Sequence, residues 1–311
     1  LHWDLEEPMA VGDTLEADAQ FRQAIEMIEQ WLPGLADILR ECKTARALHR
    51  LPGFSTLGLC PHCFDPALHL PKIAKAGFRC IELCCYHGRA AFAWDHRGHV
   101  RELARIAQAE GIQIFSVHAE RSLLESDDPG LRSARDVGMD FSDLAAEIGA
   151  QTVVFHARLA PGMNREAGLA NLRDTLAILQ EHVLPMPCRF GLENGWVGLD
   201  TGEFLDLVRS LNPGAFGLVL DTGHTLLEKN LEPILGRAGL TLCGVHLHDN
   251  DTQSDQHRLP GLGVFPWKGF GARLAACGYA GPLMLEAMPG PDETDVDAFL
   301  ARAFESLQLL A

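Results

Sequence analysis

The stretch GLVLDTGH (217–224), followed by VHLHDN (245–250) and DQHRLPGLG (255–263), decides the fold that we predict. Each of the first two parts is an apolar run that ends in side chains able to bind a metal, beginning with Asp221 in one and His246 in the other. Buried strands that end in this way are typical of the carboxyl-terminal rim of a parallel β/α barrel. We therefore expect these two strands to end at one common pocket.

The same pattern of strand, loop and helix recurs along the chain on both sides of this stretch. Strands are predicted at 54–60, 78–85, 112–118, 151–156, 188–194, 215–221, 240–249 and 281–288. Helices are predicted between and after them, at 66–76, 100–109, 133–148, 165–183, 201–211, 226–236, 267–277 and 296–310. Such alternation implies a parallel sheet, and eight units allow it to close. We predict an α/β fold, a (β/α)8 TIM barrel, over residues 51–311.

Two features at the start of the chain are assigned no catalytic chemistry. Residues 1–50 are predicted to form an N-terminal helical extension, because apolar residues recur at helical spacing over 19–39. The CPHC sequence (60–63) after the first strand is a single pair of cysteines, a weak zinc signal, and we favour a structural role. It is also not the glycine-rich phosphate loop of an open doubly wound sheet, which is the alternative fold.

Composition limits the classes of partner. Apolar residues make up 47% of the chain, and no apolar run approaches the roughly 18 residues of a membrane span, so we expect no membrane partner. The net charge of −16 opposes binding to nucleic acid. The first residues lack the features of a signal peptide, and most of the nine cysteines lie in apolar runs, as expected of reduced thiols. These observations favour a cytoplasmic protein.

Side chains that can bind a metal occur at or just after the ends of most predicted strands. They are Glu82, His118, His156, Glu193, Asp221, His224, His246, Asp255, His257 and Glu286. A single histidine at a strand end is more often a hydrogen-bonded rim residue than a ligand, but a carboxylate is costly to bury without a partner. Several carboxylates that converge on one axis would repel one another, so the set as a whole favours a bound divalent cation.

The chain resembles the xylose isomerase-like barrels, a superfamily of sugar isomerases and epimerases that also includes endonuclease IV. The resemblance covers about residues 54–290 and depends on GLEN (191–194), LDTGH (220–224), VHLHDN (245–250), DQHRLPGLG (255–263) with the following Trp267, and LMLE (283–286). It implies that one divalent metal is held by Glu193, Asp221, His246 and Glu286. His246 is preferred to His248 because it precedes x-x-Asp. Oxygen and nitrogen ligands without thiolate favour Mn²⁺, Mg²⁺, Co²⁺ or Zn²⁺, and no organic cofactor is expected.

The resemblance also implies a reaction, in which a small sugar or polyol is isomerised or epimerised through an enediolate. Glu193 and Glu286 are then the two acid–base groups. The residues expected to contact the substrate are Glu82, His118, His224, Arg258, Trp196 and Trp267. Members of this superfamily often form dimers or tetramers, so a homo-oligomer remains open.

Two other reactions and one non-enzymatic role are alternatives. The additional ligands of an endonuclease IV-like cluster would be His118, His156, His224, Asp255 and His257. The negative charge of the chain argues against an enzyme that cuts abasic DNA. A dehydratase or lyase acting on a keto-sugar or cyclic polyol is the other enzymatic alternative, and a metal-bound barrel without activity is the last.

Overall fold

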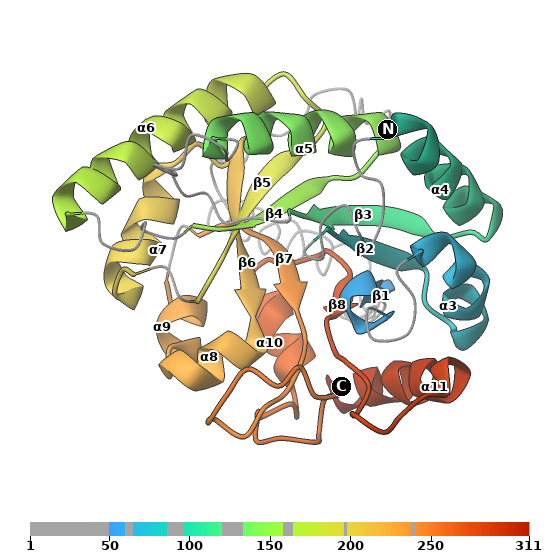
Figure 1. The fold of residues 1–311 in the computed structure, drawn as a ribbon. Helices are drawn as coiled ribbons and strands as arrows, with labels where there is room; N and C mark the ends of the chain where they lie inside the picture. Colours follow the sequence, from blue (N-terminus) through green and yellow to red (C-terminus); the bar gives the residue numbers. More distant parts are fainter. Residues whose placement is uncertain are drawn as a thin grey trace, which may run out of the picture. The chain divides into compact units, whose positions relative to one another are not determined.

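The computed structural model of the chain describes residues 50–59, 65–85, 96–119, 133–157, 164–195, 198–237 and 240–310. Within these ranges, eight parallel strands alternate with helices along the chain (Figure 1). The strands are β1 (Pro52–Ser55), β2 (Cys80–Cys84), β3 (Gln113–His118), β4 (Thr152–His156), β5 (Arg189–Glu193), β6 (Phe216–Asp221), β7 (Leu242–His246) and β8 (Leu283–Leu285).

Helices surround this sheet on its outer side (Figure 1). The α-helices are α3 (Leu70–Ala76), α4 (Arg97–Ala109), α5 (Ala134–Ile148), α6 (Arg165–Val183), α7 (Thr201–Ser210), α8 (Thr222–Glu228), α9 (Leu231–Leu235), α10 (Phe270–Ala276) and α11 (Val296–Ser306). Three short 3₁₀ helices are η1 (Thr56–Leu59), η2 (Pro66–Leu68) and η3 (Leu307–Leu310). None of the helices in the described part of the chain is long and apolar enough to cross a membrane.

The sheet closes on itself. Strand pairing runs in the order β7-β6-β5-β4-β3-β2-β1-β8, and an isolated parallel bridge between Leu247 and Leu285 links its two ends. At this closure the N–H of Leu247 donates to the carbonyl of Met284 at 2.9 Å, and the N–H of Glu286 donates to the carbonyl of Leu247 at 3.1 Å. Closure leaves no long open edge, and the predicted (β/α)8 TIM barrel is confirmed.

Alternation along the strands divides the core into two parts. In β4, Phe155 packs toward α5, where its ring lies 6.2 Å from that of Phe141, whereas Val154 joins Val219 and Cys243 in a cluster inside the barrel. Successive side chains of a strand point to opposite faces, so this split follows directly from sequence parity. A fully buried phenylalanine stabilises the fold by about 1.5–3 kcal/mol, and the large rings lie between sheet and helices.

The first strand is shorter than the predicted run of 54–60. It ends at Ser55, and the chain turns into η1, where Gly58 lies against the carbonyl of Ala287: an added Cβ would be 2.3 Å from that oxygen. The turn lets the hydroxyl of Thr56 accept a hydrogen bond from the N–H of Cys84 at 2.8 Å. After Ser55 the chain therefore turns across the carboxyl end of the barrel, whereas a strand continued to residue 60 would have extended beyond that end.

Several predicted features lie outside the described residues. They are the predicted helical extension (1–50), of which only residue 50 is described, the CPHC sequence (60–63) and Trp196. The stretches directly after the first five strands are also outside, at 60–64, 86–95, 120–132, 158–163 and 196–197. The described part of the carboxyl-terminal rim therefore consists of the strand ends and of the segments that follow β6, β7 and β8.

Candidate active site

Four side chains from the carboxyl ends of β5 to β8 converge inside the barrel, and we call them the inner cluster: Glu193, Asp221, His246 and Glu286. One ligand atom from each lies within 4.8 Å of the other three. Nδ1 of His246 is 3.2 Å from Oε2 of Glu286 and 3.3 Å from Oε1 of Glu193. All four are at most 3% exposed. The structure thus brings together the four residues that the resemblance implied as metal ligands.

The imidazole of His246 is held between Glu82 and the carboxylates of the inner cluster. Its Nε2 lies 3.0 Å from Oε2 of Glu82, which places a proton on Nε2. Nδ1 is buried and has no hydrogen-bond partner of good geometry among the described residues, although it faces two carboxylates. A histidine that ligates a metal commonly donates its other ring N–H to a carboxylate in this way. The residues present therefore fit a divalent cation bound by Nδ1 and the neighbouring carboxylate oxygens.

Asp221 connects the inner cluster to the backbone. It ends β6 and caps α8, because its Oδ1 accepts a hydrogen bond from the N–H of His224 at 2.6 Å. Its Oδ2 lies 2.8 Å from Nε2 of His248 and 3.9 Å from Nδ1 of His246, so it faces the inner cluster. One oxygen is thus committed to the helix terminus, which fixes the direction of the other.

Asn194 joins the ends of β5 and β6 and is a residue that we did not predict. Its side-chain oxygen accepts from the N–H of Asp221 at 2.8 Å, and its amide donates to the carbonyl of Asp221 at 3.1 Å. Its own carbonyl accepts from Nδ1 of His224 at 2.7 Å. Gly195 follows with a φ of 112°, and a Cβ there would be 2.7 Å from the His224 ring. The sequence offered one signal for this role, since Asn194 directly follows Glu193 in GLEN (191–194).

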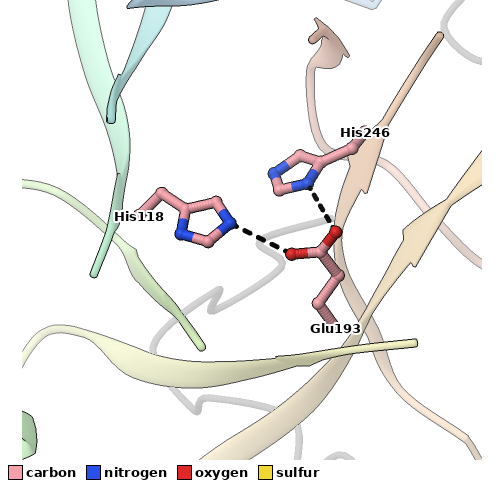
Figure 2. A group of neighbouring side chains, drawn as sticks. All are labelled: His118, Glu193 and His246. Atoms are coloured by element: carbon pink, nitrogen blue, oxygen red, sulfur yellow. Dashed lines mark hydrogen bonds and ion pairs between the residues drawn. The ribbon is translucent and has the colours of Figure 1, made fainter. Parts of the chain in front are cut away.

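Histidines surround Glu193 on both of its oxygens. Oε2 lies 3.1 Å from Nε2 of His118 and 3.4 Å from Nε2 of His156, while Oε1 lies 3.3 Å from Nδ1 of both His224 and His246. Figure 2 shows the bridge that Glu193 makes between His118 and His246. The pairing of His156 with Glu193 follows from the register of β4 and β5. Two predicted additional ligands, His118 and His156, therefore contact Glu193.

The two catalytic candidates differ in their pKa values. Burial by itself raises the pKa of Glu193, but the charges of His156 and His246 and the hydrogen bond from His118 outweigh it, and the pKa falls well below its usual value. For Glu286, burial raises the pKa, and repulsion from Glu193 and Glu82 adds to this effect against the attraction of His246 and His257. Carboxyl groups separated in this way suit opposite roles in proton transfer.

A second group of metal-capable side chains lies beside the first, and we call it the rim group: His248, Asp255 and His257. Their ligand atoms also lie within 4.8 Å of one another. Oδ2 of Asp255 is 3.1 Å from Nε2 of His257 and 3.4 Å from Nε2 of His224. His248 was not among the predicted site residues, although its i,i+2 spacing from His246 is the spacing of side chains on one face of a strand.

Asp249 holds the segment that carries the rim group. Its carboxylate accepts hydrogen bonds from the backbone N–H groups of Gly261 and Phe265, each at 3.0 Å, and from the indole N–H of Trp267 at 2.8 Å. The Trp267 ring is 5% exposed and packs on Phe265 at a centroid distance of 4.4 Å. The ring and the N–H of Trp267 are thus both engaged within the fold, and the structure gives no support to the expectation that Trp267 offers a face to the substrate.

Two further expectations of substrate contact receive no support. The guanidinium of Arg258 lies 3.3 Å from Oδ2 of Asp251 and 3.3 Å from the carbonyl of Leu262. It is part-exposed and is not brought to the inner cluster. Glu82 is fully buried, and its oxygens accept hydrogen bonds from Ser55, Ser116 and His246, so it does not line an open pocket.

The opposite end of the barrel differs from this end in its chemistry. A cavity of about 440 Å³ opens there, among residues that include Thr152, Arg189, Leu242 and Tyr279 near the amino ends of the strands. Among the described residues, its lining contains no histidine and no carboxylate. The catalytic residues of β/α barrels lie at the carboxyl ends of the strands, so the inner cluster is the candidate active site and the larger cavity is not.

Sequence relatives were found for the barrel portion of the chain. The protein y4fM of Sinorhizobium fredii is 26% identical over 249 residues, which cover 70% of this chain and 79% of that protein. The 3-dehydroshikimate dehydratase of Pseudomonas aeruginosa is 29% identical over 238 residues. That match covers 70% of this chain but only 35% of the dehydratase.

Solved structures share the fold. A fusion of a xylose isomerase-like TIM barrel with a 4-hydroxyphenylpyruvate dioxygenase superimposes with a TM-score of 0.69 at 24% identity, over 83% of this chain and 42% of the fusion protein. A D-tagatose 3-epimerase-like protein gives a TM-score of 0.66 at 22% identity, over 83% of this chain and 97% of its own. At these identities the likeness shows the fold alone. The family described as "Xylose isomerase-like TIM barrel" matches residues 70–303, and the chain belongs to this family.

Proposed function

We propose that the chain is a divalent-metal-dependent isomerase or epimerase that moves a proton at a carbon next to the carbonyl of a small sugar. The observation that carries the proposal is the convergence of Glu193, Asp221, His246 and Glu286 within 4.8 Å. The family and the similarity to an epimerase-like structure support the same class of enzyme. Three buried carboxylates this close together repel one another, and a bound cation would offset this repulsion.

The two glutamates provide the proton transfer in this proposal. A divalent ion held by the inner cluster would supply a Lewis acid that polarises the substrate carbonyl. Glu193 is held in its charged form by the surrounding imidazoles and removes the proton. Glu286, whose pKa is raised by burial in the metal-free protein, is the partner that returns a proton to the substrate. A base and an acid at one site are what isomerisation and epimerisation require.

The rim group would bind the hydroxyl groups of the substrate. Asp255 and His257 are 13% and 16% exposed as side chains, so they are more accessible than the inner cluster. Nδ1 of His257 donates to the carbonyl of Glu286 at 2.9 Å and Nε2 donates to Oδ2 of Asp255 at 3.1 Å, so the charged imidazole is held at both nitrogens. These donors and acceptors suit a polyhydroxylated ligand, as does His224, whose Nε2 lies 3.4 Å from Asp255.

The proposal is tested by hydrogen exchange. The purified protein is loaded with Mn²⁺ and incubated with a panel of ketoses and aldoses in D₂O, and deuterium next to the carbonyl is measured by mass spectrometry and NMR. We expect exchange with at least one sugar, and its loss in Glu193→Gln and Glu286→Gln. Sugars that bind without any exchange would contradict the proposal.

A dehydratase is the second candidate, because a 3-dehydroshikimate dehydratase is the relative with 29% identity. Loss of water from a hydroxy ketone begins with removal of the same type of proton, so the inner cluster could serve either reaction. The two differ in their product, since dehydration of a cyclic keto-polyol gives a conjugated enone that absorbs in the ultraviolet. Appearance of such absorbance without sugar exchange would favour the dehydratase. Nicking of abasic DNA, with about three metals per chain, would instead favour endonuclease-type chemistry.

A further inference from the structure

Glu82 lies at the centre of a row of polar side chains inside the barrel. Strand register pairs Ser55 of β1 with Glu82 of β2, and Glu82 with Ser116 of β3. The hydroxyl of Ser55 donates to Oε1 of Glu82 at 3.1 Å, and the hydroxyl of Ser116 donates to Oε2 at 2.8 Å. Residues in register on neighbouring strands face the same side of a sheet, so this row is built into the barrel.

The same carboxylate also contacts the inner cluster. Oε2 of Glu82 lies 3.0 Å from Nε2 of His246, so each of its oxygens has a hydrogen-bond donor. Glu82 is 0% exposed, and the cavity beside it has a volume of about 10 Å³. A cavity of this size holds one water molecule at most, so a sugar cannot reach this carboxylate from that side.

Packing alone does not account for a carboxylate at this position. A buried carboxylate without compensation costs several kcal/mol, and an apolar side chain of similar volume would fill the space without that cost. What the carboxylate adds is an acceptor that holds the proton of His246 on Nε2. Nδ1, which lies 3.3 Å from an oxygen of Glu193 and 3.2 Å from one of Glu286, is then the nitrogen that gives up its proton when a cation binds.

We propose that Glu82 is a positioning residue, which fixes the tautomer and ring orientation of His246 and thereby strengthens the binding of a divalent metal by the inner cluster. This inference rests on the proposed metal-dependent function. Ser55 and Ser116 hold the carboxylate in place. Carboxylates that support a ligating histidine typically contribute about 10–100-fold to metal affinity.

The test measures metal affinity, independently of any substrate. The metal-free protein is titrated with Mn²⁺ in competition with a chelator, for wild type, Glu82→Gln, His246→Gln and the double variant. We expect Glu82→Gln to weaken Mn²⁺ binding about 10–100-fold. In the His246→Gln background the same change should have less than about a twofold effect, because its partner is gone. Thr152→Val, which alters a buried hydroxyl in the same layer, is the matched control with unchanged affinity.

NMR provides a second readout that a purely structural role would not change. In Zn²⁺-loaded protein with ¹⁵N-labelled histidine, the Nε2–H proton of His246 should resonate far downfield because it is bound to a carboxylate, and Glu82→Gln should move it upfield. If Glu82→Gln does not fold, Ser116→Ala removes one donor to the same oxygen and should weaken Mn²⁺ binding about two- to tenfold.

The outcomes separate the two proposals. Wild-type protein that binds Mn²⁺ tightly, with Glu82→Gln and Ser116→Ala both within twofold of it, would overturn the role of Glu82 and leave the proposed function intact. Wild-type protein that binds none of Mn²⁺, Mg²⁺, Co²⁺ and Zn²⁺ would overturn the proposed function, and this inference with it.

Discussion

The inner cluster and the rim group are built from similar residue types but are supported in different ways. The inner cluster stands at or directly beside the ends of four hydrogen-bonded strands and is almost fully buried. The rim group stands on the segment after β7, which is held by the carboxylate of Asp249 and by backbone hydrogen bonds within the loop, and Asp255 and His257 are partly exposed. Rigid strand ends suit a cation that requires fixed geometry, whereas a more accessible loop suits the recognition of a substrate.

The largest effect is expected in the inner cluster. Glu286→Gln keeps the size of the side chain but removes its acid–base function, so we expect turnover to fall by about 10²–10⁴-fold. The rate should be measured together with the metal content of the variant. Glu110→Gln, an exposed change at the end of α4, serves as the control with unchanged turnover. Undiminished turnover in metal-loaded Glu286→Gln would show that this carboxylate does not take part in the reaction.

A smaller effect, of a different kind, is expected in the rim group. Asp255→Asn removes the charge that faces His224 and His257, so we expect KM to rise about tenfold through weaker hydrogen bonds to the substrate. The metal content should remain at one ion per chain, as measured by elemental analysis. Loss of a metal ion from this variant would mean that the rim group also holds a cation, and the distinction between the two groups would fail.

The charge state of the histidines provides a test by pH. In the metal-free protein, burial opposes protonation of His246, but Glu286, Glu82 and Glu193 raise its pKa well above the usual value. Burial likewise opposes protonation of His257, whose pKa is nevertheless raised to about 9, chiefly by Asp255 and Glu286. Because both pKa values are raised on folding, the charged imidazoles stabilise the metal-free fold fully below about pH 6.5. For His257, this stabilisation is lost as the pH rises through about 9.

Metal binding has the opposite dependence, since a ligating imidazole must lose its proton. We therefore expect the difference in Tm between Mn²⁺-loaded and metal-free protein to increase from pH 6.5 to pH 9. Thermal unfolding at several pH values, with buffers that do not bind Mn²⁺, measures this difference. A difference that stays constant or shrinks over this range would contradict the ligand role of the histidine.

The smallest effect is expected where the rim segment meets the core. Trp267→Phe removes the indole donor to Asp249, so we expect the free energy of unfolding to fall by about 1–2 kcal/mol, as measured in urea. KM should not change, because the indole N–H is bound to Asp249 and the ring packs on Phe265. Arg258→Gln, which loses only a part-exposed ion pair with Asp251, should change stability by less than about 0.5 kcal/mol. A large rise in KM in either variant would restore a substrate contact there.

The strand pattern was predictable because parity and burial leave a direct record in the sequence. Continuous apolar runs such as GLVL before Asp221 are required of strands that are covered on both faces. Their ends coincide with the rim because parallel strands in a barrel share one direction. Parity and burial thus predicted which side chains reach the rim, and the resemblance to the xylose isomerase-like barrels then singled out the four residues of the inner cluster among them.

The roles of the neighbouring residues could not be predicted in the same way. Glu82, Arg258 and Trp267 were expected at the substrate, since each follows or lies within a motif at the rim. Their partners are distant in sequence: His246 is 164 residues from Glu82, and Asp249 is 18 residues from Trp267. The sequence shows which side chains approach the rim, but not which of them are already satisfied by another protein group.

The sequence by itself determined the barrel and the set of metal-capable side chains at the strand ends, because alternation of apolar residues and abrupt polar strand ends are local properties of the chain. The resemblance to a known family selected the inner cluster from that set. Only the tertiary structure decided which nitrogen of His246 faces the carboxylates, and that Glu82 and Asp249 support the site from within. Those assignments depend on distances between side chains on different strands, and closure of the barrel is what sets these distances.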